Sequence, residues 1–137
     1  MNIDPILKGY TEAVLAQDVE ALMSLYDDEA RVFDLWSEWV YEGKAAWRKA
    51  IADWFGSVDG QKVAVEFDDV RSADSGELAS VQAIITYRDL DAAGEETNAM
   101  QNRLTWVLQR IDGTWKIVHE HTSAPIDGET FKVVLKR

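Results

Sequence analysis

The chain has 137 residues, of which 47% are hydrophobic and 28% charged, so it is expected to fold as a single domain over residues 1–137 and is not a disordered chain. Its 14 basic and 25 acidic residues give a net charge of −11, which excludes nucleic acid and anionic membranes as expected partners. There is no cysteine, so disulfide scaffolds and thiolate chemistry are excluded. Residues 1–23 contain no apolar run long enough for a signal peptide or a membrane span, and we therefore expect a cytoplasmic protein.

The first part of the chain is predicted to be helical. Asp4 and Pro5 precede apolar residues at helical spacing, which predicts an amphipathic helix over residues 4–17 with Asp4 as its cap. Asp18 is a second N-cap signal, and a short helix is expected to follow it until an acidic break at residues 27–29.

The rest of the chain predicts one strand, one helix and a run of strands. Residues 31–35 are β-prone with apolar side chains on both faces, interrupted by Asp34. Residues 44–55 are rich in helix formers and stop at Gly56. Turn signals separate four further strands over residues 62–71, 78–90, 96–110 and 114–123. This order predicts an α+β fold in which three helices pack on one face of a curved antiparallel sheet.

Two polar residues in apolar surroundings are the first catalytic candidates. Burial in its strand would raise the pKa of Asp34 toward the range useful to a general base. The alternative is a structural role, with Asp34 at the end of the strand and either solvated or paired with Arg31 or Arg48. Tyr10 lies on the apolar stripe of the first helix, where its hydroxyl either donates to a substrate oxygen or is satisfied within the core.

The last predicted strand carries two histidines and an acid. Strand alternation predicts two faces, with Ile117, His119 and His121 on one and Val118, Glu120 and Thr122 on the other. Histidines two residues apart can chelate a metal, but no third ligand has a readable spacing, so we predict no metal site and no cofactor. A single β-bulge would exchange the inward-facing residues, so the register decides which side chains reach a ligand.

Aromatic residues are the remaining compositional signal. The six tryptophans need a core, a subunit interface or a ligand cavity to pack into. The aromatic residues considered for these roles are Trp36, Trp39, Tyr41, Trp47, Trp54, Tyr87 and Trp106. The sequence has no Gly-rich phosphate loop, no Gly-x-Ser-x-Gly elbow and no Cys/His pair, so phosphoryl transfer and serine-type hydrolysis lack their usual parts.

The order of the predicted elements, ending in Trp115-Lys-Ile-Val-His-Glu-His-Thr-Ser-Ala-Pro125, resembles the nuclear transport factor 2-like superfamily over the whole chain. This motif and the preceding Asp-Gly-Thr of residues 112–114 also resemble the association domain of calcium/calmodulin-dependent kinase II, and SnoaL-like relatives share the pattern. The resemblance implies a cone-shaped, cystatin-like fold. It also implies a homodimer formed through the exposed sheet face, with Trp115, His119 and His121 as candidate interface residues.

A comparison with ketosteroid isomerase adds residue roles. Residues 10–43 align without a gap, which implies the oxyanion-hole tyrosine at Tyr10 and the general base at Asp34. The isomerase also uses a protonated aspartic acid on a late strand, and the matching position here is Trp106 or a neighbouring residue. Glu120 or the indole N–H of Trp106 is implied as the replacement donor. The pocket arginines of the kinase association domain correspond to Ile85, Trp106 and Thr122, so a carboxylate-binding pocket is not implied.

The resulting hypothesis is a SnoaL-like or ketosteroid isomerase-like protein that binds a small hydrophobic, oxygen-bearing molecule in an apolar pocket. Asp34 is the predicted general base for isomerase, cyclase or hydrolase chemistry, with Tyr10 and Glu120 as hydrogen-bond donors. The residues predicted to line the pocket are Trp36, Trp54, Phe55, Ile85, Tyr87, Trp106, Val118 and Thr122. The alternative is a ligand-binding or oligomerisation module without catalysis, similar to the kinase association domain.

Overall fold

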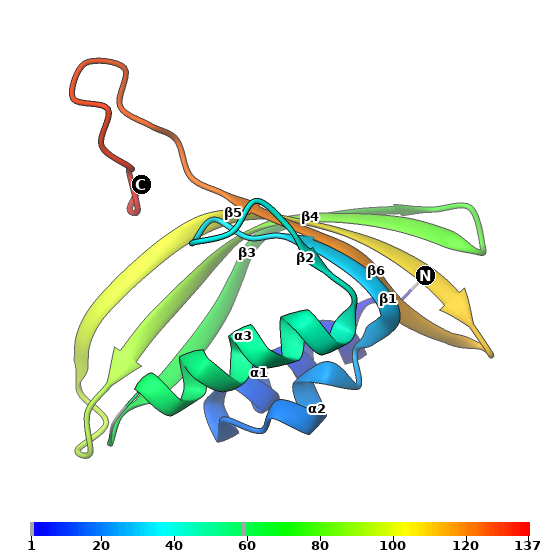
Figure 1. Cartoon of the computed structure of the whole chain (residues 1–137), viewed down its shortest axis with the longest axis horizontal. Coiled ribbons are helices and arrows are strands. Elements are labelled where there is room, and N and C mark those ends of the chain that lie inside the picture. Colours follow the sequence, from blue (N-terminus) through cyan, green and yellow to red (C-terminus); the bar gives the residue numbers. More distant parts are fainter. Residues whose placement is uncertain (1, 59) are drawn as a thin grey trace.

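The computed structural model describes residues 2–58 and 60–137 and shows a curved sheet arching over three helices (Figure 1). The helices are α1 (Asp4–Ala16), α2 (Val19–Met23) and α3 (Lys44–Ser57). The strands are β1 (Tyr26–Phe33), β2 (Tyr41–Glu42), β3 (Lys62–Asp74), β4 (Leu78–Leu90), β5 (Glu96–Ile111) and β6 (Thr114–Ser123). They form one sheet in the order β2-β1-β6-β5-β4-β3. None of the helices in the described part of the chain is long and apolar enough to cross a membrane.

The predicted α+β fold with helices on one face of a curved sheet is confirmed. The bounds of β4 and β6 are those predicted, whereas β3 continues to Asp74 and β5 to Ile111, slightly beyond their predicted ends. The sheet is mixed rather than wholly antiparallel, because β1 pairs with β6 in parallel while the other neighbouring strands run antiparallel. This parallel pairing joins the beginning and the end of the chain.

The N-terminal helix begins at the predicted residue, ends one residue before its predicted end and buries one stripe of side chains. Its apolar stripe of Ile6, Tyr10, Ala13 and Val14 is buried against the sheet, as the helical spacing predicts. Asp4 is the first helical residue and not the cap, and its backbone N–H donates to Asn2 Oδ1 at 3.0 Å. The Asn2 side chain therefore accepts a hydrogen bond from an N–H of the first turn that has no partner within the helix. The sequence had predicted this capping role for Asp4. The Asp18 cap of α2 is confirmed, since Asp18 Oδ1 accepts from the N–H of Ala21 at 3.0 Å.

Strand β1 starts earlier and ends earlier than predicted. The acidic residues 27–29 lie inside this strand and do not break the chain, because Tyr26, Ala30 and Val32 are buried while Asp28 and Glu29 face solvent. An irregular register between Tyr26 and Arg31 accommodates the acidic residues. The strand ends at Phe33, so the predicted interior position of Asp34 is wrong: Asp34 begins the loop that leads to β2.

A bulge in β6 changes the two faces predicted for this strand. Val107 pairs with His119 and Leu108 pairs with Ile117, so Val118 is left without a partner on β5. The alternation therefore restarts at Val118, and Ile117 shares the buried face with Glu120 and Thr122. The predicted face shared by Ile117, His119 and His121 is wrong. Of the two inward-facing sets that the sequence left open, the structure buries Glu120 and Thr122.

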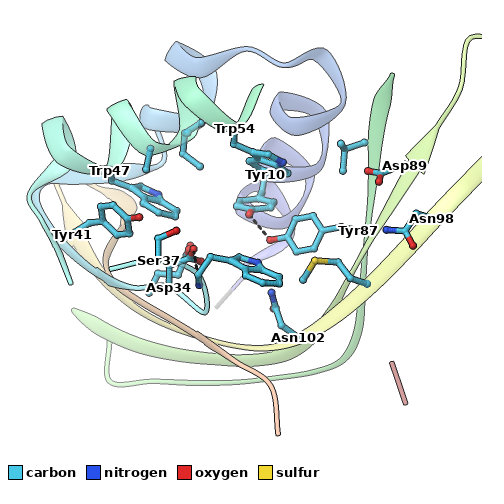
Figure 2. Close-up of a pocket in the computed structure, with 16 residues that line it drawn as sticks. Tyr10, Asp34, Ser37, Tyr41, Trp47, Trp54, Tyr87, Asp89, Asn98 and Asn102 are labelled. Atoms are coloured by element: carbon cyan, nitrogen blue, oxygen red, sulfur yellow. Dashed lines mark hydrogen bonds between the residues drawn. The ribbon is translucent and has the colours of Figure 1, made fainter. Parts of the chain in front are cut away.

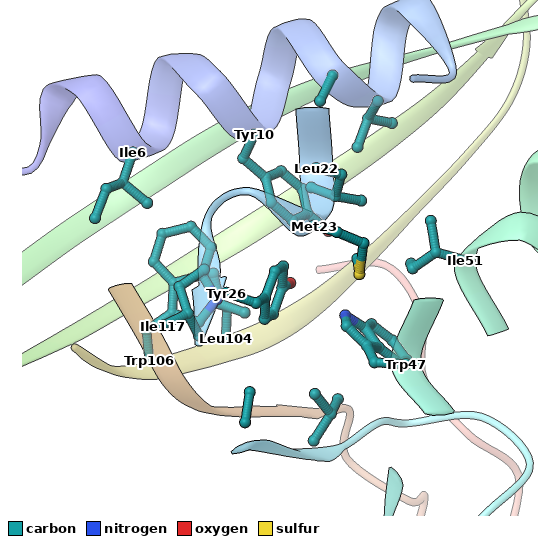
Figure 3. Close-up of a cluster of buried hydrophobic side chains, with 14 of the residues drawn as sticks. Ile6, Tyr10, Leu22, Met23, Tyr26, Trp47, Ile51, Leu104, Trp106 and Ile117 are labelled. Carbon is teal, nitrogen blue, oxygen red and sulfur yellow. The ribbon is translucent and has the colours of Figure 1, made fainter. Parts of the chain in front are cut away.

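The core lies between the concave face of the sheet and the helices (Figure 3). Trp106 of β5, Tyr26 of β1 and Ile117 of β6 are almost fully buried at its centre, and Trp47 of α3 packs against Tyr26. Each such side chain contributes about 1.5–3 kcal/mol by leaving water, so this cluster is a main source of stability. The helices and the sheet are held together chiefly through these contacts.

The chain after β6 leaves the sheet and turns back (Figure 1). Residues 124–137 are joined to themselves by a bridge between Ile126 and Val133. They return to the sheet where the N–H of Gln101 donates to the carbonyl of Leu135 at 2.6 Å. Several large apolar side chains of this segment are exposed, among them Phe131 at 79%.

Candidate functional site

A cavity of about 380 Å³ lies between the concave face of the sheet and helices α1 and α3 (Figure 2). Its walls are largely aromatic, formed by Tyr10, Trp36, Tyr41, Trp47, Trp54 and Tyr87. The acidic side chains on its walls are Asp34, Asp89 and Glu120. Among the described residues that line the cavity, none is Lys, Arg or His. The volume is within the range typical of small-molecule sites.

Asp34 reaches this cavity from the first residue after β1. The Thr122 hydroxyl donates to Asp34 Oδ1 at 3.0 Å, and the backbone N–H of Trp36 donates to Oδ2 at 3.3 Å. The Thr122 oxygen in turn accepts from the N–H of Leu35 at 2.8 Å, which fixes the hydroxyl in place. Burial raises the pKa of Asp34, and the hydrogen bonds lower it in part. The carboxyl is therefore oriented, half-buried and available at the cavity wall.

The arginines offered as alternative partners do not contact this carboxyl. Arg31 forms its ion pair with Glu42, and Arg48 forms its ion pair with Glu20. Within residues 2–58 and 60–137, no basic side chain forms an ion pair with Asp34. A purely structural ion-pair role for Asp34 is therefore excluded for the described residues.

Glu120 lies deeper, on the buried face of β6, and is 2% exposed. The Tyr26 hydroxyl and the Trp106 indole N–H both donate to its Oε1, at 2.5 and 2.9 Å. Within the described part of the chain no hydrogen bond reaches Oε2. Burial raises the pKa of Glu120 to about 7, although the two hydrogen bonds favour its charged form and the nearby Asp34 adds to the rise. Near neutrality, Glu120 can therefore either donate or accept a proton.

Two tyrosines from different elements join their hydroxyls across the cavity (Figure 2). Tyr10 of α1 and Tyr87 of β4 are 2.8 Å apart at their oxygens. Burial raises the pKa of both tyrosines far above the usual value, so both remain neutral. Because one proton of the pair is used between the two oxygens, one hydroxyl proton is left to donate to another group.

These groups can carry proton-transfer chemistry. Asp34 can accept a proton, and neutral Glu120 and the tyrosine pair can donate hydrogen bonds to a developing negative charge on oxygen. Environments that push the pKa values of neighbouring acids upward are typical of catalytic acid and base pairs. We call the group of Asp34, Glu120 and Tyr10 the Asp34 end of the cavity.

The opposite end contains an acid that the sequence analysis missed. Asp89 of β4 pairs in register with Val63 of β3 and Asn98 of β5, and all three line the cavity. Figure 2 shows Asp89 and Asn98 on the far side of Tyr87 from Asp34. We call this region, with Trp54, the Asp89 end. Period-two alternation along residues 78–90 places Tyr87 and Asp89 on the same face, and this signal could have identified Asp89.

Asn102 is a second residue that was missed. It is 6% exposed and lies on β5, opposite Ile85 of β4. Its Oδ1 is buried without a hydrogen-bond partner among the described residues, and the nitrogen end of its amide turns toward the other cavity residues (Figure 2). A buried amide of this kind costs free energy unless a ligand or a water satisfies it. Ser37, Tyr41, Trp47 and Met100 line the cavity too, without having been predicted as pocket residues.

The residues predicted to line the pocket divide into two groups. Trp36, Trp54 and Tyr87 line the cavity, as do the predicted catalytic residues. The others lie outside it: Phe55, Ile85, Trp106, Val118 and Thr122. Thr122 and Trp106 act instead on the acids, Thr122 by donating to Asp34 and Trp106 by donating to Glu120. The implied role of Trp106 as a donor to the ligand is therefore wrong, because its N–H is already used.

The remaining three residues are held away from the cavity by packing. Phe55 turns from the cavity into the core and packs beside Trp54 at a ring distance of 5.1 Å. Ile85 is fully buried. Val118 is the unpaired bulge residue.

His119 and His121 lie on the outer side of β6, away from Glu120. Both rings pack edge-on against Phe33, with ring distances of 4.8 and 5.5 Å. His119 Nδ1 lies 2.8 Å from the carbonyl of Arg31. Trp115 is half-buried under the guanidinium of Arg110, at 4.7 Å. In the described residues, no three His, Asp or Glu side chains gather in a way that could hold a metal ion.

A family model described as a SnoaL-like domain matches residues 3–127. An NTF2-like protein of unknown function from Pseudomonas putida is 25% identical over 98% of this chain and 92% of that chain, with a TM-score of 0.86. An NTF2-like protein with a cystatin-like fold from Novosphingobium aromaticivorans is 17% identical over 93% and 82%, with a TM-score of 0.76. A calcium/calmodulin-dependent protein kinase II association domain protein from Xanthomonas campestris is 20% identical over 90% and 85%, with a TM-score of 0.70. No curated protein matches the chain. The predicted nuclear transport factor 2-like, cystatin-like fold is confirmed.

Proposed function

Since this chain belongs to the SnoaL-like domain family, we propose that its cavity binds a small hydrophobic, oxygen-bearing molecule and that Asp34 acts on it as a general base. The observation that carries the proposal is the state of the Asp34 carboxyl. It lines the cavity, forms no ion pair with the described residues and has a raised pKa. A carboxylate that is oriented but not neutralised by a cation is a competent base.

The reaction that fits this arrangement is proton abstraction next to a carbonyl. Asp34 removes a proton from the carbon beside the carbonyl, the electron pair of the C–H bond forms a C=C bond, and the π pair of the carbonyl moves to the oxygen to give an enolate. Hydrogen bonds from neutral Glu120 and from the Tyr10–Tyr87 pair stabilise the charge on that oxygen. The proton on Asp34 then returns to carbon, at the same position or at another one. Activation of a water by Asp34 would use the same groups for hydrolysis.

The test follows hydrogen exchange on a small ketone. The probe is 2-tetralone, whose protons beside the carbonyl exchange with deuterium oxide and are followed by NMR. We expect the protein to accelerate this exchange and Asp34→Asn to reduce the acceleration by about 10²- to 10⁴-fold. Glu38→Gln is the matched control, because it neutralises an exposed acid in the same loop. Circular dichroism shows whether each variant is folded.

Equal exchange rates with the native protein and with Asp34→Asn would contradict the role of Asp34. Binding of the ketone without any acceleration of exchange would favour a ligand-binding module. In that case Asp34 contributes to affinity only.

A second candidate is an assembly module. Two observations support an assembly module. The chain is similar to the kinase association domain protein. It also exposes large apolar side chains, namely Trp39 at 95%, Phe131 at 79% and Ile126 at 61%. For the first candidate, by contrast, we propose a homodimer formed through the outer sheet face that carries His119 and His121. Native mass spectrometry of the purified protein tests this: a dimer that retains a small molecule supports the first candidate. A larger ring of empty subunits would support the assembly module and remove the roles of Asp34 and Tyr10.

A further inference from the structure

The Asp89 end of the cavity has no assigned role in the proposed reaction. The carboxylate of Asp89 is half-buried and, within residues 2–58 and 60–137, accepts no hydrogen bond and forms no ion pair. The neighbouring Arg88 points away and pairs with Glu66 and Glu96 instead. The cavity therefore contains an acid whose charge is not neutralised by the described residues.

Aromatic faces stand next to this acid. Tyr87 lies two positions before Asp89 on the same face of β4, and its ring meets Trp54 of α3 edge-on at 5.7 Å and 82°. Met100 pairs with Tyr87 and Asn98 pairs with Asp89 on β5, so a thioether and an amide complete the wall. Carboxylates and aromatic faces both attract an organic cation.

The rest of the cavity has the same preference. None of the described lining residues is basic, and the chain as a whole has a net charge of −11. An anionic ligand would meet repulsion from both ends of the cavity, while a cation would be attracted. The buried amide of Asn102, 6% exposed, turns its nitrogen toward the cavity and can donate a hydrogen bond to an oxygen atom of a ligand.

We infer that the ligand carries a protonated amine or quaternary ammonium group, bound by Asp89 against the faces of Trp54 and Tyr87. This inference rests on the proposed function and narrows its ligand class to aromatic or hydrophobic amines that also bear oxygen. The charged nitrogen binds at the Asp89 end, and the oxygen-bearing part extends toward Asp34. Asp89 thereby determines which molecules enter, and it takes no part in the proton transfer.

The test compares three probes that share one ring and differ in charge. Tyramine is cationic, tyrosol replaces the ammonium group by a hydroxyl, and 4-hydroxyphenylacetate is anionic. Binding is measured by tryptophan fluorescence and calorimetry at about 0.15 M salt, which screens the long-range field of the protein. We expect tyramine to bind about tenfold more tightly than tyrosol, and 4-hydroxyphenylacetate to bind most weakly.

The variants assign the preference to one carboxylate. Asp89→Asn should bring the ratio of tyramine to tyrosol affinity close to one, and Asp89→Glu should retain the preference. Asp53→Asn is the control, because it removes an equal charge from the exposed side of α3, next to Trp54. It should leave the ratio as it is in the native protein.

Three outcomes would overturn the inference. Equal or stronger binding of tyrosol or 4-hydroxyphenylacetate would refute the charge preference while leaving the proposed function intact. A tyramine preference that survives in Asp89→Asn would show that another carboxylate is responsible. Failure of all three probes to bind at about 10 mM would count against an aromatic ligand in this cavity, and so against the proposed function as well.

Discussion

Glu120 at one end of the cavity and Asp89 at the other lie in opposite environments. At the Asp34 end, Glu120 is buried and hydrogen-bonded, and its pKa is raised to about 7. At the Asp89 end, the carboxylate is half-buried and has no hydrogen bond or ion pair among the described residues. Burial raises the pKa of Glu120 into the range of proton exchange, whereas the Asp89 carboxylate has no partner among the described residues and can attract a cation. One cavity thus combines two uses of the same functional group.

The largest loss of stability is expected when the core side chain that donates a hydrogen bond to Glu120 is removed. Trp106→Ala removes a fully buried side chain and the N–H that donates to Glu120 Oε1. We expect the free energy of unfolding to fall by about 3–5 kcal/mol, as measured by urea denaturation. Trp54→Ala at the opposite end is the comparison, and its half-buried ring should cost clearly less. Equal losses would show that the two ends do not differ in their dependence on the core.

The next prediction concerns how the free energy of unfolding depends on pH. Because the pKa of Glu120 is raised to about 7 in the folded state from an ordinary value of 4.5, the folded protein binds its proton more tightly than the unfolded chain. Its contribution to stability is complete below about pH 4.5 and is lost as the pH rises to about 7. The total is of the order of 3 kcal/mol.

Urea denaturation of the native protein and of Glu120→Gln at pH 5 and pH 8 measures this contribution. Glutamine can still accept hydrogen bonds from Tyr26 and Trp106 but cannot ionise. We expect the difference between the two proteins to move in favour of the variant at the higher pH. A difference that does not change with pH would contradict the raised pKa.

A smaller effect is expected from the hydroxyl that orients Asp34. Thr122→Val removes both the donor to Asp34 Oδ1 and the acceptor of the Leu35 N–H. We expect a stability loss of about 1–2 kcal/mol and a further rise in the pKa of Asp34, because the lost hydrogen bond favoured its charged form. NMR titration of the carboxyl carbon measures this pKa. Thr122→Ser keeps the hydroxyl and should leave the pKa close to its native value.

The smallest change in stability is expected at the Asp89 end of the cavity. Asp89→Asn removes a charge that makes no hydrogen bond or ion pair with the described residues, so the free energy of unfolding should change by no more than about 0.5 kcal/mol. Thermal denaturation measures this difference. A loss comparable to that of Trp106→Ala would mean that Asp89 supports the fold, and its proposed role toward a ligand would have to be withdrawn.

Strand positions are predictable from the sequence where turn residues and the burial pattern agree. The turn residues around residues 78–90 and 114–123 predict β4 and β6 with their observed bounds. Which face of β6 points inward was left open by the sequence, because a bulge exchanges the two faces. The bulge at Val118 was not predictable, because its position depends on how β6 pairs with β5 and not on any residue of β6 itself. For this reason the predicted face of Ile117 was wrong.

The candidate site was predicted less completely than the fold. Tyr10, Asp34 and Glu120 do share one cavity. Aromatic residue type alone, however, cannot distinguish a core side chain such as Trp106 from a cavity side chain such as Trp54. That distinction depends on the curvature of the sheet and on how closely α3 approaches it, both of which are set by contacts between distant segments.

The parallel pairing of β1 with β6 has a consequence for how the protein folds. Asp34 and Thr122, whose contact completes the base, are 88 residues apart in the sequence, and Tyr26 and Glu120 are 94 apart. Closing loops of this length carries a large entropic cost, so these contacts are expected among the last to form. On the ribosome, the proposed catalytic end cannot assemble until the final strand has emerged. Until then, the partly folded chain exposes the unpaired edges of β1 and β5.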